Sequence, residues 1–201
     1  KNIKKNWIMV LVLSFLSVTA YNTLVYQGLL TTTAINSFLI NSSRPTIIVL
    51  FSIIFFRQGI TVLQSLGFIL ALLGTSNILF RGDITYLMHL EFNSGDLWIL
   101  AATICWAIYT VLLSKRPKIH SFSFLAVTVL LGMLMLLPFY VWETIYVRPM
   151  PLRFESIAGV FYLAVISSIT AYLLYNRAVE LAGPNKAGQT SYMLPITGSI
   201  L

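Results

Sequence analysis

The sequence predicts an all-α fold, a polytopic transmembrane helix bundle built from two inverted five-helix repeats. Three observations lead to this prediction. Only 9% of the 201 residues are charged while 58% are hydrophobic, long apolar runs alternate with short charged connections, and one tripeptide recurs in two of the runs. A soluble domain would carry about 25% charged residues. So few charges cannot cover a surface that faces water, and most of the surface must therefore face lipid.

Seven apolar segments are long enough to be considered as membrane spans, because a helix needs about 20 apolar residues to cross a bilayer. The first segment lacks a small-residue cleavage site, so it is predicted to be a membrane helix and not a signal peptide. In chain order, the seven segments are Trp7–Leu29, Thr32–Phe56, Thr61–Phe80, Leu97–Ser114, Phe122–Val141, Ser156–Asn176 and Ala187–Leu201.

The connections between these segments alternate in charge, which predicts their orientation. Those on one side carry a single acid, Glu180, and the basic residues Lys1, Lys4, Lys5, Arg57, Lys115, Arg116, Lys118, Arg177 and Lys186. Those on the other side carry three basic residues and five acids, namely Arg81, Arg148, Arg153, Asp83, Glu91, Asp96, Glu143 and Glu155. The positive-inside rule then places the Lys1 end in the cytoplasm of a multi-pass protein of the inner (plasma) membrane. Basic clusters placed between apolar runs fix orientation, and they do not indicate nucleic-acid binding.

An internal repeat divides the chain. The tripeptide Thr19–Tyr21 recurs as Thr170–Tyr172, and Pro45 recurs as Pro195 at nearly the same spacing. The second copy lies five spans after the first, and an odd number of crossings reverses its direction. Inverted repeats are typical of secondary transporters, whose substrate sites lie at the repeat interface near the midplane.

A five-helix unit predicts how the chain is organised. Residues 1–93 would hold the last three helices of the first unit, and residues 94–201 would hold four helices of the second. The whole protein would then have ten helices, with two before this sequence and one after it.

Arg44 is the most unusual residue within a span, since it lies near the middle of Thr32–Phe56. An arginine at that depth costs about 2.5–3.5 kcal/mol on insertion scales, so it normally faces a cavity or a partner. Asn41 and Ser37 fall on the same helical face. The three residues are predicted to line a polar path.

Two interpretations of Arg44 remain open. Its guanidinium could hold a carboxylate or phosphate of a substrate through two hydrogen bonds. It could instead bond backbone carbonyls that Pro45 frees in its own helix. No Asp or Glu lies deep in any of the seven segments. A buried ion pair would therefore need a helix outside this sequence.

Other polar and aromatic residues in the spans are weaker candidates for substrate contact. A single Ser or Tyr often only bonds a neighbouring helix, which contributes about 0.6 kcal/mol. Asn side chains need several partners in lipid, so both Asn36 and Asn41 are candidates. The full predicted substrate-binding set is Arg44, Asn41, Ser37, Asn36, Tyr21, Trp106, Tyr109, Tyr172, Asn176 and Tyr192.

Several other residues have structural explanations. Asp96 follows a turn-forming run and is expected to cap the next helix. Arg177 and Glu180 lie one turn apart and are expected to form a local pair. One cysteine, Cys105, and two histidines in separate segments cannot assemble a metal cluster, so we predict no metal and no cofactor.

Several stretches together resemble the EamA-type transporters of the drug/metabolite transporter superfamily, and the resemblance spans nearly the whole chain. Each motif is degenerate, but their order and spacing match the family. The stretches are Thr33–Asn36 with Pro45, Ser94–Leu97, Cys105–Thr110, Ala171–Ala178 with Gly183-Pro184, and Tyr192–Pro195.

The resemblance implies ten helices in two inverted halves around a central cavity, with this chain covering the third to ninth. It also implies export of amino acids or related metabolites. The sequence departs from the family twice. Arg57-Gln58-Gly59 stands where the family often has Gly-Glu-Arg, and Arg44 stands where a small or apolar residue usually precedes the proline. The second departure suggests a substrate with an anionic group.

The leading functional prediction is a secondary transporter, most simply an exporter, that moves a small polar metabolite by alternating access. The sequence has no Walker-type loop for ATP, so a proton or ion gradient is expected in place of ATP hydrolysis, and facilitated export is the alternative. No nucleophile and base, His-Glu-x-x-His motif or aspartate pair can be assembled within the spans, so an enzyme is not predicted. The alternative is a flippase for a lipid or lipid-linked anionic head group. A lateral opening between helices would favour that alternative, whereas an enclosed aqueous cavity would favour a metabolite carrier.

Overall fold

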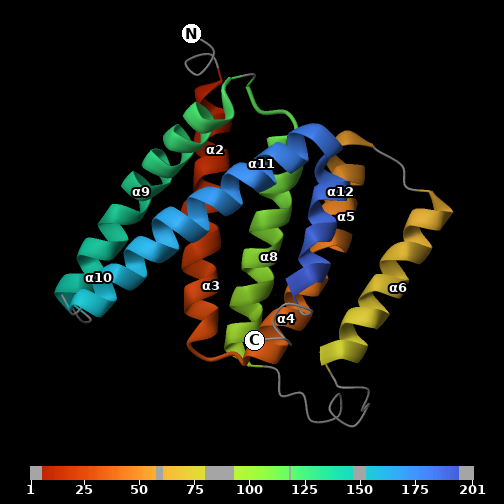
Figure 1. Cartoon of the computed structure of the whole chain (residues 1–201), viewed down its shortest axis with the longest axis horizontal. Coiled ribbons are helices and arrows are strands. Elements are labelled where there is room, and N and C mark those ends of the chain that lie inside the picture. Colours follow the sequence, from red (N-terminus) through yellow and green to blue (C-terminus); the bar gives the residue numbers. More distant parts are fainter. Residues whose placement is uncertain (1–5, 58–60, 80–92, 118, 147–152, 195–201) are drawn as a thin grey trace.

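The computed structural model describes residues 6–57, 61–79, 93–117, 119–146 and 153–194. Throughout these ranges the chain forms helices joined by short connections, and no strand occurs among them. The predicted all-α class is therefore confirmed. Figure 1 shows a bundle in which α8 (Ser94–Leu113) runs between two other helical rods, while a fourth rod crosses it obliquely.

The first rod consists of α2 (Trp7–Ser14), the π-helix η1 (Phe15–Ala20) and α3 (Tyr21–Leu29). It coincides with the first predicted span. Its buried serine hydroxyls are satisfied within the helix, because Ser14 and Ser17 each donate to the carbonyl four residues earlier at 2.7 Å. The rod can therefore bury polar side chains against its neighbours without leaving them unpaired.

The second rod is broken near its middle into α4 (Ala34–Ser42) and α5 (Arg44–Phe56). Pro45 lies in the first turn of α5, where its missing N–H is tolerated. Arg57 ends α5 in the left-handed conformation, with φ of 51°. The proline therefore breaks the helix beside Arg44, within the thickness of the bundle.

Helix α8 is the centre of the structure. It packs against η1, α3, α4, α5, α11 and α12, and more than half of its span is buried. Asn93 and Asp96 form a capping box at its start, which confirms the predicted cap. Gly28 and Gly95 allow α3 and α8 to approach closely, because a Cβ on Gly95 would lie 2.5 Å from the Gly28 carbonyl oxygen.

The remaining helices surround this centre. Helix α9 (Ser121–Tyr146) packs against the first rod, and α6 (Val62–Leu79) packs against α4 at the edge of the bundle (Figure 1). The crossing rod consists of α10 (Phe154–Phe161), the π-helix η2 (Tyr162–Ile169) and α11 (Thr170–Ala182). Gly183, with φ of 83°, then turns the chain into α12 (Pro184–Gly188) and the 3₁₀ turn η3 (Gln189–Tyr192).

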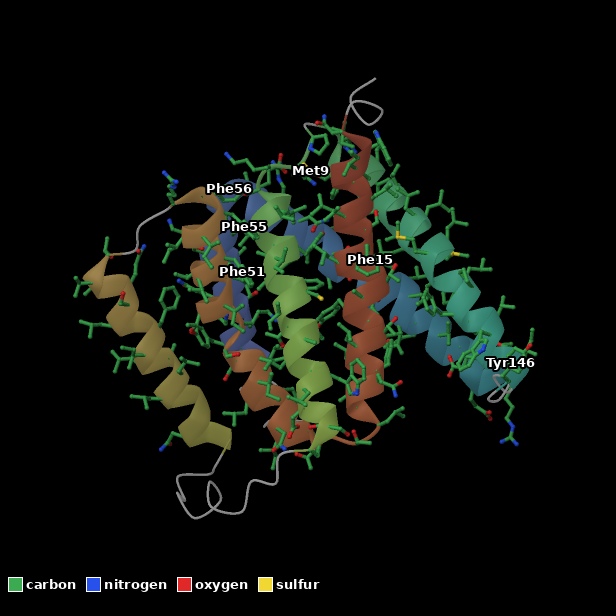
Figure 2. All side chains as sticks on the ribbon, turned by 180° about the vertical axis from the view of Figure 1, so that it is seen from behind. Met9, Phe15, Phe51, Phe55, Phe56 and Tyr146 are labelled. Atoms are coloured by element: carbon green, nitrogen blue, oxygen red, sulfur yellow. The ribbon has the colours of Figure 1, made fainter. Side chains whose placement is uncertain are left out.

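Five helices in the described part of the chain are long and apolar enough to cross a membrane, and they match five of the seven predicted segments. The segment predicted at Thr61–Phe80 forms α6, in which only Val62–Gly74 qualifies as a shorter apolar helix. The last predicted segment begins in α12, while its residues 195–201, including Pro195, lie outside the described residues. Large apolar side chains cover the outside of the bundle, among them Phe15, Phe55 and Tyr146 (Figure 2). The chain is therefore a multi-pass membrane protein.

Two helices extend further than predicted. Helix α9 continues past Val141 to Tyr146, and α11 continues past Asn176 to Ala182. Arg177 and Glu180 consequently lie on the last turns of α11, where their side chains pair at 2.8 Å as predicted. An ion pair one turn apart stabilises a helix end that reaches the polar interface.

The two copies of the repeated tripeptide occupy similar local structures. Thr19–Tyr21 and Thr170–Tyr172 each lie where a π-helix passes into an α-helix. The rods that carry them run in opposite directions in Figure 1. The inverted repeat itself stays a prediction. The ten-helix count and the division at residues 93 and 94 stay predictions.

Candidate functional site

A cavity of about 490 Å³ lies where the broken second rod, α8 and the two π-helix junctions meet. Its wall combines aromatic rings with polar side chains and one arginine. The lining residues are Tyr21, Asn22, Arg44, Trp106, Ser168, Ala171, Tyr172, Tyr175, Thr190, Ser191 and Leu194. A concave site with a few converging polar groups is the usual form of a small-molecule site.

Arg44 is buried in the wall of this cavity, with 7% of its surface exposed. Its Nη2 donates to the Asn41 side-chain oxygen and, at 3.3 Å, to the Tyr21 hydroxyl. Its Nε has no hydrogen-bond partner among the described residues. No carboxylate pairs with Arg44 within the described ranges. The guanidinium therefore retains an unneutralised charge and an unused donor.

Two carbonyls just before the break in the second rod are bonded by serine hydroxyls and not by Arg44. Ser42 and Ser43 donate their hydroxyls to the carbonyls of Leu39 and Ile40 at 2.6 and 2.7 Å. Within the described structure, both hydrogen bonds of Arg44 go to side chains and none goes to a backbone carbonyl. These contacts favour the ligand interpretation of Arg44 over the structural one.

Aromatic rings hold the guanidinium in place. The Arg44 Cζ lies 5.6 Å from the ring centres of both Tyr21 and Trp106, which is within cation–π distance. Trp106 in turn contacts Tyr21, Tyr172 and Tyr175, with ring centres 4.6, 5.4 and 5.2 Å apart. A charged group in such a rigid setting loses little conformational freedom when it binds a ligand.

A second layer of hydrogen bonds supports these rings. Tyr109 packs on Trp106 with ring centres 5.4 Å apart and donates its hydroxyl to Asn176 at 2.7 Å. Both Tyr109 and Asn176 are fully buried and lie outside the lining of the cavity. Their placement indicates a positioning role, in which they orient Trp106 from behind.

The other predicted residues occupy different positions. Asn41 contacts Arg44 and accepts from Thr103 at 3.4 Å, and its amide nitrogen donates to the Ser37 carbonyl at 2.9 Å. Asn36 instead donates to the Asp96 carboxylate at 3.1 Å, so it helps join α4 to the start of α8. Tyr192 lies in η3, next to lining residues, but is not itself part of the lining.

The predicted set lacks five polar residues that line the cavity, namely Asn22, Ser168, Tyr175, Thr190 and Ser191. Tyr175 lies one turn after Tyr172 on the same face of α11, so its spacing could have identified it. Asn22 directly follows a repeated tyrosine and carried no comparable signal. Its side chain donates to the Val18 carbonyl at 2.8 Å, a carbonyl of the π-helix η1.

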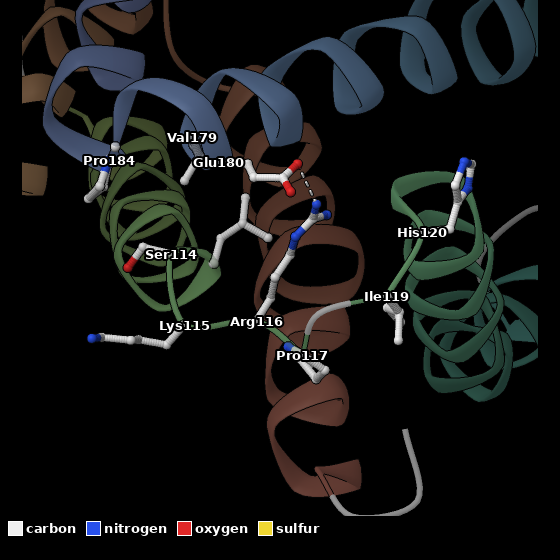
Figure 3. Close-up of a pocket in the computed structure, with 11 residues that line it drawn as sticks. Ser114, Lys115, Arg116, Pro117, Ile119, His120, Val179, Glu180 and Pro184 are labelled. Carbon is white, nitrogen blue, oxygen red and sulfur yellow. Dashed lines mark hydrogen bonds and ion pairs between the residues drawn. The ribbon is translucent and has the colours of Figure 1, made fainter. Parts of the chain in front are cut away.

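A larger cavity of about 670 Å³ lies near the ends of α8 and α11, beside the basic connection Lys115–Pro117 (Figure 3). Its arginine is already neutralised. Arg116 donates to Glu180 at 2.9 Å and to Ser121 at 3.0 Å. Figure 3 shows Lys115 extending away from this pair. Because Arg116 is already paired with Glu180, this cavity is a poorer candidate for an anion site than the cavity at Arg44.

Comparison with known proteins identifies the family of this helical membrane bundle. The model of the EamA-like transporter family matches residues 1–80 and 93–201. The chain belongs to the EamA-like transporter family. Membership confirms the predicted family and places the chain among transporters and not among enzymes.

Three EamA relatives illustrate the extent of the similarity. The uncharacterized transporter YyaM of Bacillus subtilis is 24% identical over 200 residues, covering 99% of this chain and 66% of the relative. The uncharacterized transporter YetK of the same organism is 27% identical over 204 residues, covering 98% and 60%. An uncharacterized transporter of Archaeoglobus fulgidus is 24% identical over 195 residues, covering 96% and 66%. No solved structure matches the chain significantly.

The chain thus spans about two thirds of the length of the curated relatives that it matches. The cavity at Arg44 lies within this part of the protein. It contains the Arg44 guanidinium and the rings of Tyr21, Trp106 and Tyr172.

Proposed function

We propose that the whole protein is a secondary transporter of the inner membrane that exports a small polar metabolite with an anionic group. One observation carries this proposal, namely that Arg44 lies buried in a central cavity and has no carboxylate partner among the described residues. A buried unpaired charge is costly, so it is retained where a ligand supplies the opposite charge. A carboxylate or phosphate would supply that charge and accept hydrogen bonds from the guanidinium fork.

The proposed mechanism is alternating access around this cavity. The cavity is bordered by both copies of the repeated tripeptide, and secondary transporters place their sites at such a repeat interface. The π-helical segments η1 and η2 lie beside it, and π-bulges are frequent at functional sites. Rocking of the two predicted halves would expose Arg44 to each side in turn. The expected energy source is a proton or ion gradient.

The test uses the whole protein in proteoliposomes, with efflux measured for a panel of labelled amino acids and organic anions. Wild type is expected to move a carboxylate-bearing solute, and Arg44→Gln is expected to lose that activity while remaining folded. Arg177→Gln is the matched control, because it removes an arginine whose side chain is 56% exposed at a helix end. Transport that survives Arg44→Gln would refute the anionic substrate.

The second candidate is a flippase for an anionic head group. It is favoured by a small apolar cavity that adjoins the Arg44 cavity between η1, α9 and η2. Movement of a labelled anionic phospholipid between leaflets, in the absence of efflux of any soluble solute, would support this candidate.

A further inference from the structure

An apolar side cavity of about 190 Å³ adjoins the Arg44 cavity. The two cavities share three lining residues, Asn22, Ser168 and Tyr172. Beyond these, the walls of the side cavity are apolar. They are formed by Val18, Leu125, Val129, Ala164 and Ile169. The polar and apolar cavities therefore meet at a shared wall formed by the three shared residues.

The shared wall is held by carbonyls of the π-helix η1. Tyr172 donates its hydroxyl to the Ser17 carbonyl at 2.5 Å, and Asn22 donates its amide to the Val18 carbonyl at 2.8 Å. On the other rod, Ser168 donates to the Leu163 carbonyl at 2.8 Å. All three polar side chains thus have hydrogen-bond partners in the protein. They form a neutral boundary with no charge to repel an apolar group.

The side cavity also reaches the outer surface of the bundle. Val129 on α9 and Ile169 on η2 are both exposed there. An apolar hollow at this place loses contacts unless a non-polar group fills it. Because the side cavity meets the Arg44 cavity at Asn22, Ser168 and Tyr172, we assign this group to the ligand that Arg44 holds.

We propose that the side cavity binds the non-polar chain of the transported solute, so that the substrate is an amphipathic anion. Its anionic group is held by Arg44 and its chain passes Tyr172 into the pocket formed by Val18, Val129 and Ala164. This inference rests on the proposed transport function and adds a substrate class to it. It predicts that affinity increases with chain length, because each buried methylene contributes to binding.

The experiment uses the whole protein in proteoliposomes and two labelled probes, ethanesulfonate and hexanesulfonate. Sulfonates stay ionised at any working pH, so they do not leak through the bilayer as neutral acids. Wild type is expected to show a KM for hexanesulfonate at least about tenfold lower than for ethanesulfonate. Ala164→Phe fills the side cavity and should abolish this difference, because neither chain can then enter the cavity.

Two variants serve as controls. Ala158→Phe adds the same ring on the same rod, in α10, at an exposed position that does not line either cavity. It should change neither KM. Arg44→Gln should reduce transport of both probes. An Ala164→Phe variant that still prefers the longer probe would overturn the inference.

The outcomes separate this inference from the proposed function. If transport of both probes depends on Arg44 but the longer chain is not preferred, the proposed role of the side cavity is overturned. The proposed anion transport at Arg44 then still holds. Transport of both probes without dependence on Arg44 would overturn the proposed anion site as well. If the protein moves neither sulfonate but moves a labelled anionic phospholipid between leaflets, both proposals fail and the flippase is supported.

Discussion

The guanidinium groups of Arg44 and Arg116 are both shielded from solvent, but their surroundings differ. Both guanidinium groups lie against aromatic rings, Arg44 on Tyr21 and Trp106 and Arg116 on Phe124. Among the residues that the structure describes, only Arg116 has a carboxylate partner, Glu180 at 2.9 Å. The comparison teaches that burial alone does not identify a functional arginine. The missing counter-charge distinguishes Arg44.

The largest expected effect is a loss of transport when the guanidinium of Arg44 is replaced. Arg44→Lys keeps the charge but removes the planar fork, so transport of a carboxylate-bearing solute should fall about tenfold or more. Efflux from proteoliposomes measures this. Arg116→Lys keeps a charge beside Glu180 and should leave efflux nearly unchanged. Equal losses in the two variants would remove the proposed difference between the arginines.

The next effect concerns stability at the neutralised site. Arg116→Met keeps apolar volume against Phe124 but removes the donor to Ser121 and Glu180, so the free energy of unfolding should fall by about 1–3 kcal/mol. Unfolding of the whole protein in detergent, followed by circular dichroism, would measure the change. A variant as stable as wild type would show that the contacts of Arg116 with Ser121 and Glu180 do not hold α11 to the start of α9.

The same substitution at the other arginine should act in the opposite direction. Arg44→Met removes a buried charge that lacks a carboxylate partner, so we expect stability to rise by about 1 kcal/mol while transport is lost. The same unfolding measurement and an efflux assay would test both parts. A clear loss of stability would mean that Arg44 is held for structural reasons.

The smallest expected effect concerns the exposed end of α11. Arg177→Ala removes one of the two partners of Glu180, but the Arg177 side chain is 56% exposed. Exposed ion pairs contribute about 0–1 kcal/mol, so the change in unfolding free energy should stay below about 0.5 kcal/mol. A larger loss in the unfolding measurement would show that the Arg177–Glu180 pair, and not Arg116, is the main contact at this end.

Local parts of the site could be predicted because they depend on helical spacing. Asn41 contacts Arg44 one turn later, Arg177 pairs with Glu180, and Asp96 caps α8, all as the sequence indicated. Contacts between helices could not be predicted in this way. Asn36 bonds Asp96 across 60 positions, which its place in an apolar run gave no means of foreseeing.

The structure was also needed to show which predicted residues line the cavity and which lie behind its lining. Tyr109 and Trp106 lie three residues apart on α8, yet only Trp106 lines the cavity. Tyr109 instead donates to Asn176, which lies on α11, 67 positions later in the sequence. A sequence pattern identifies which residues share one face of a helix. It does not determine which of them line a cavity and which are covered by a neighbouring helix.

The sequence by itself determined the all-α class, the membrane setting and the depth of Arg44, because these depend on composition and on the length of apolar runs. Only the tertiary structure decided that serine hydroxyls bond two carbonyls beside the helix break, that aromatic rings hold Arg44 beside a cavity, and that an apolar side cavity adjoins it. The physical reason is that a cavity and its counter-charges arise from the packing of several helices. No single helix carries that information in its own periodicity.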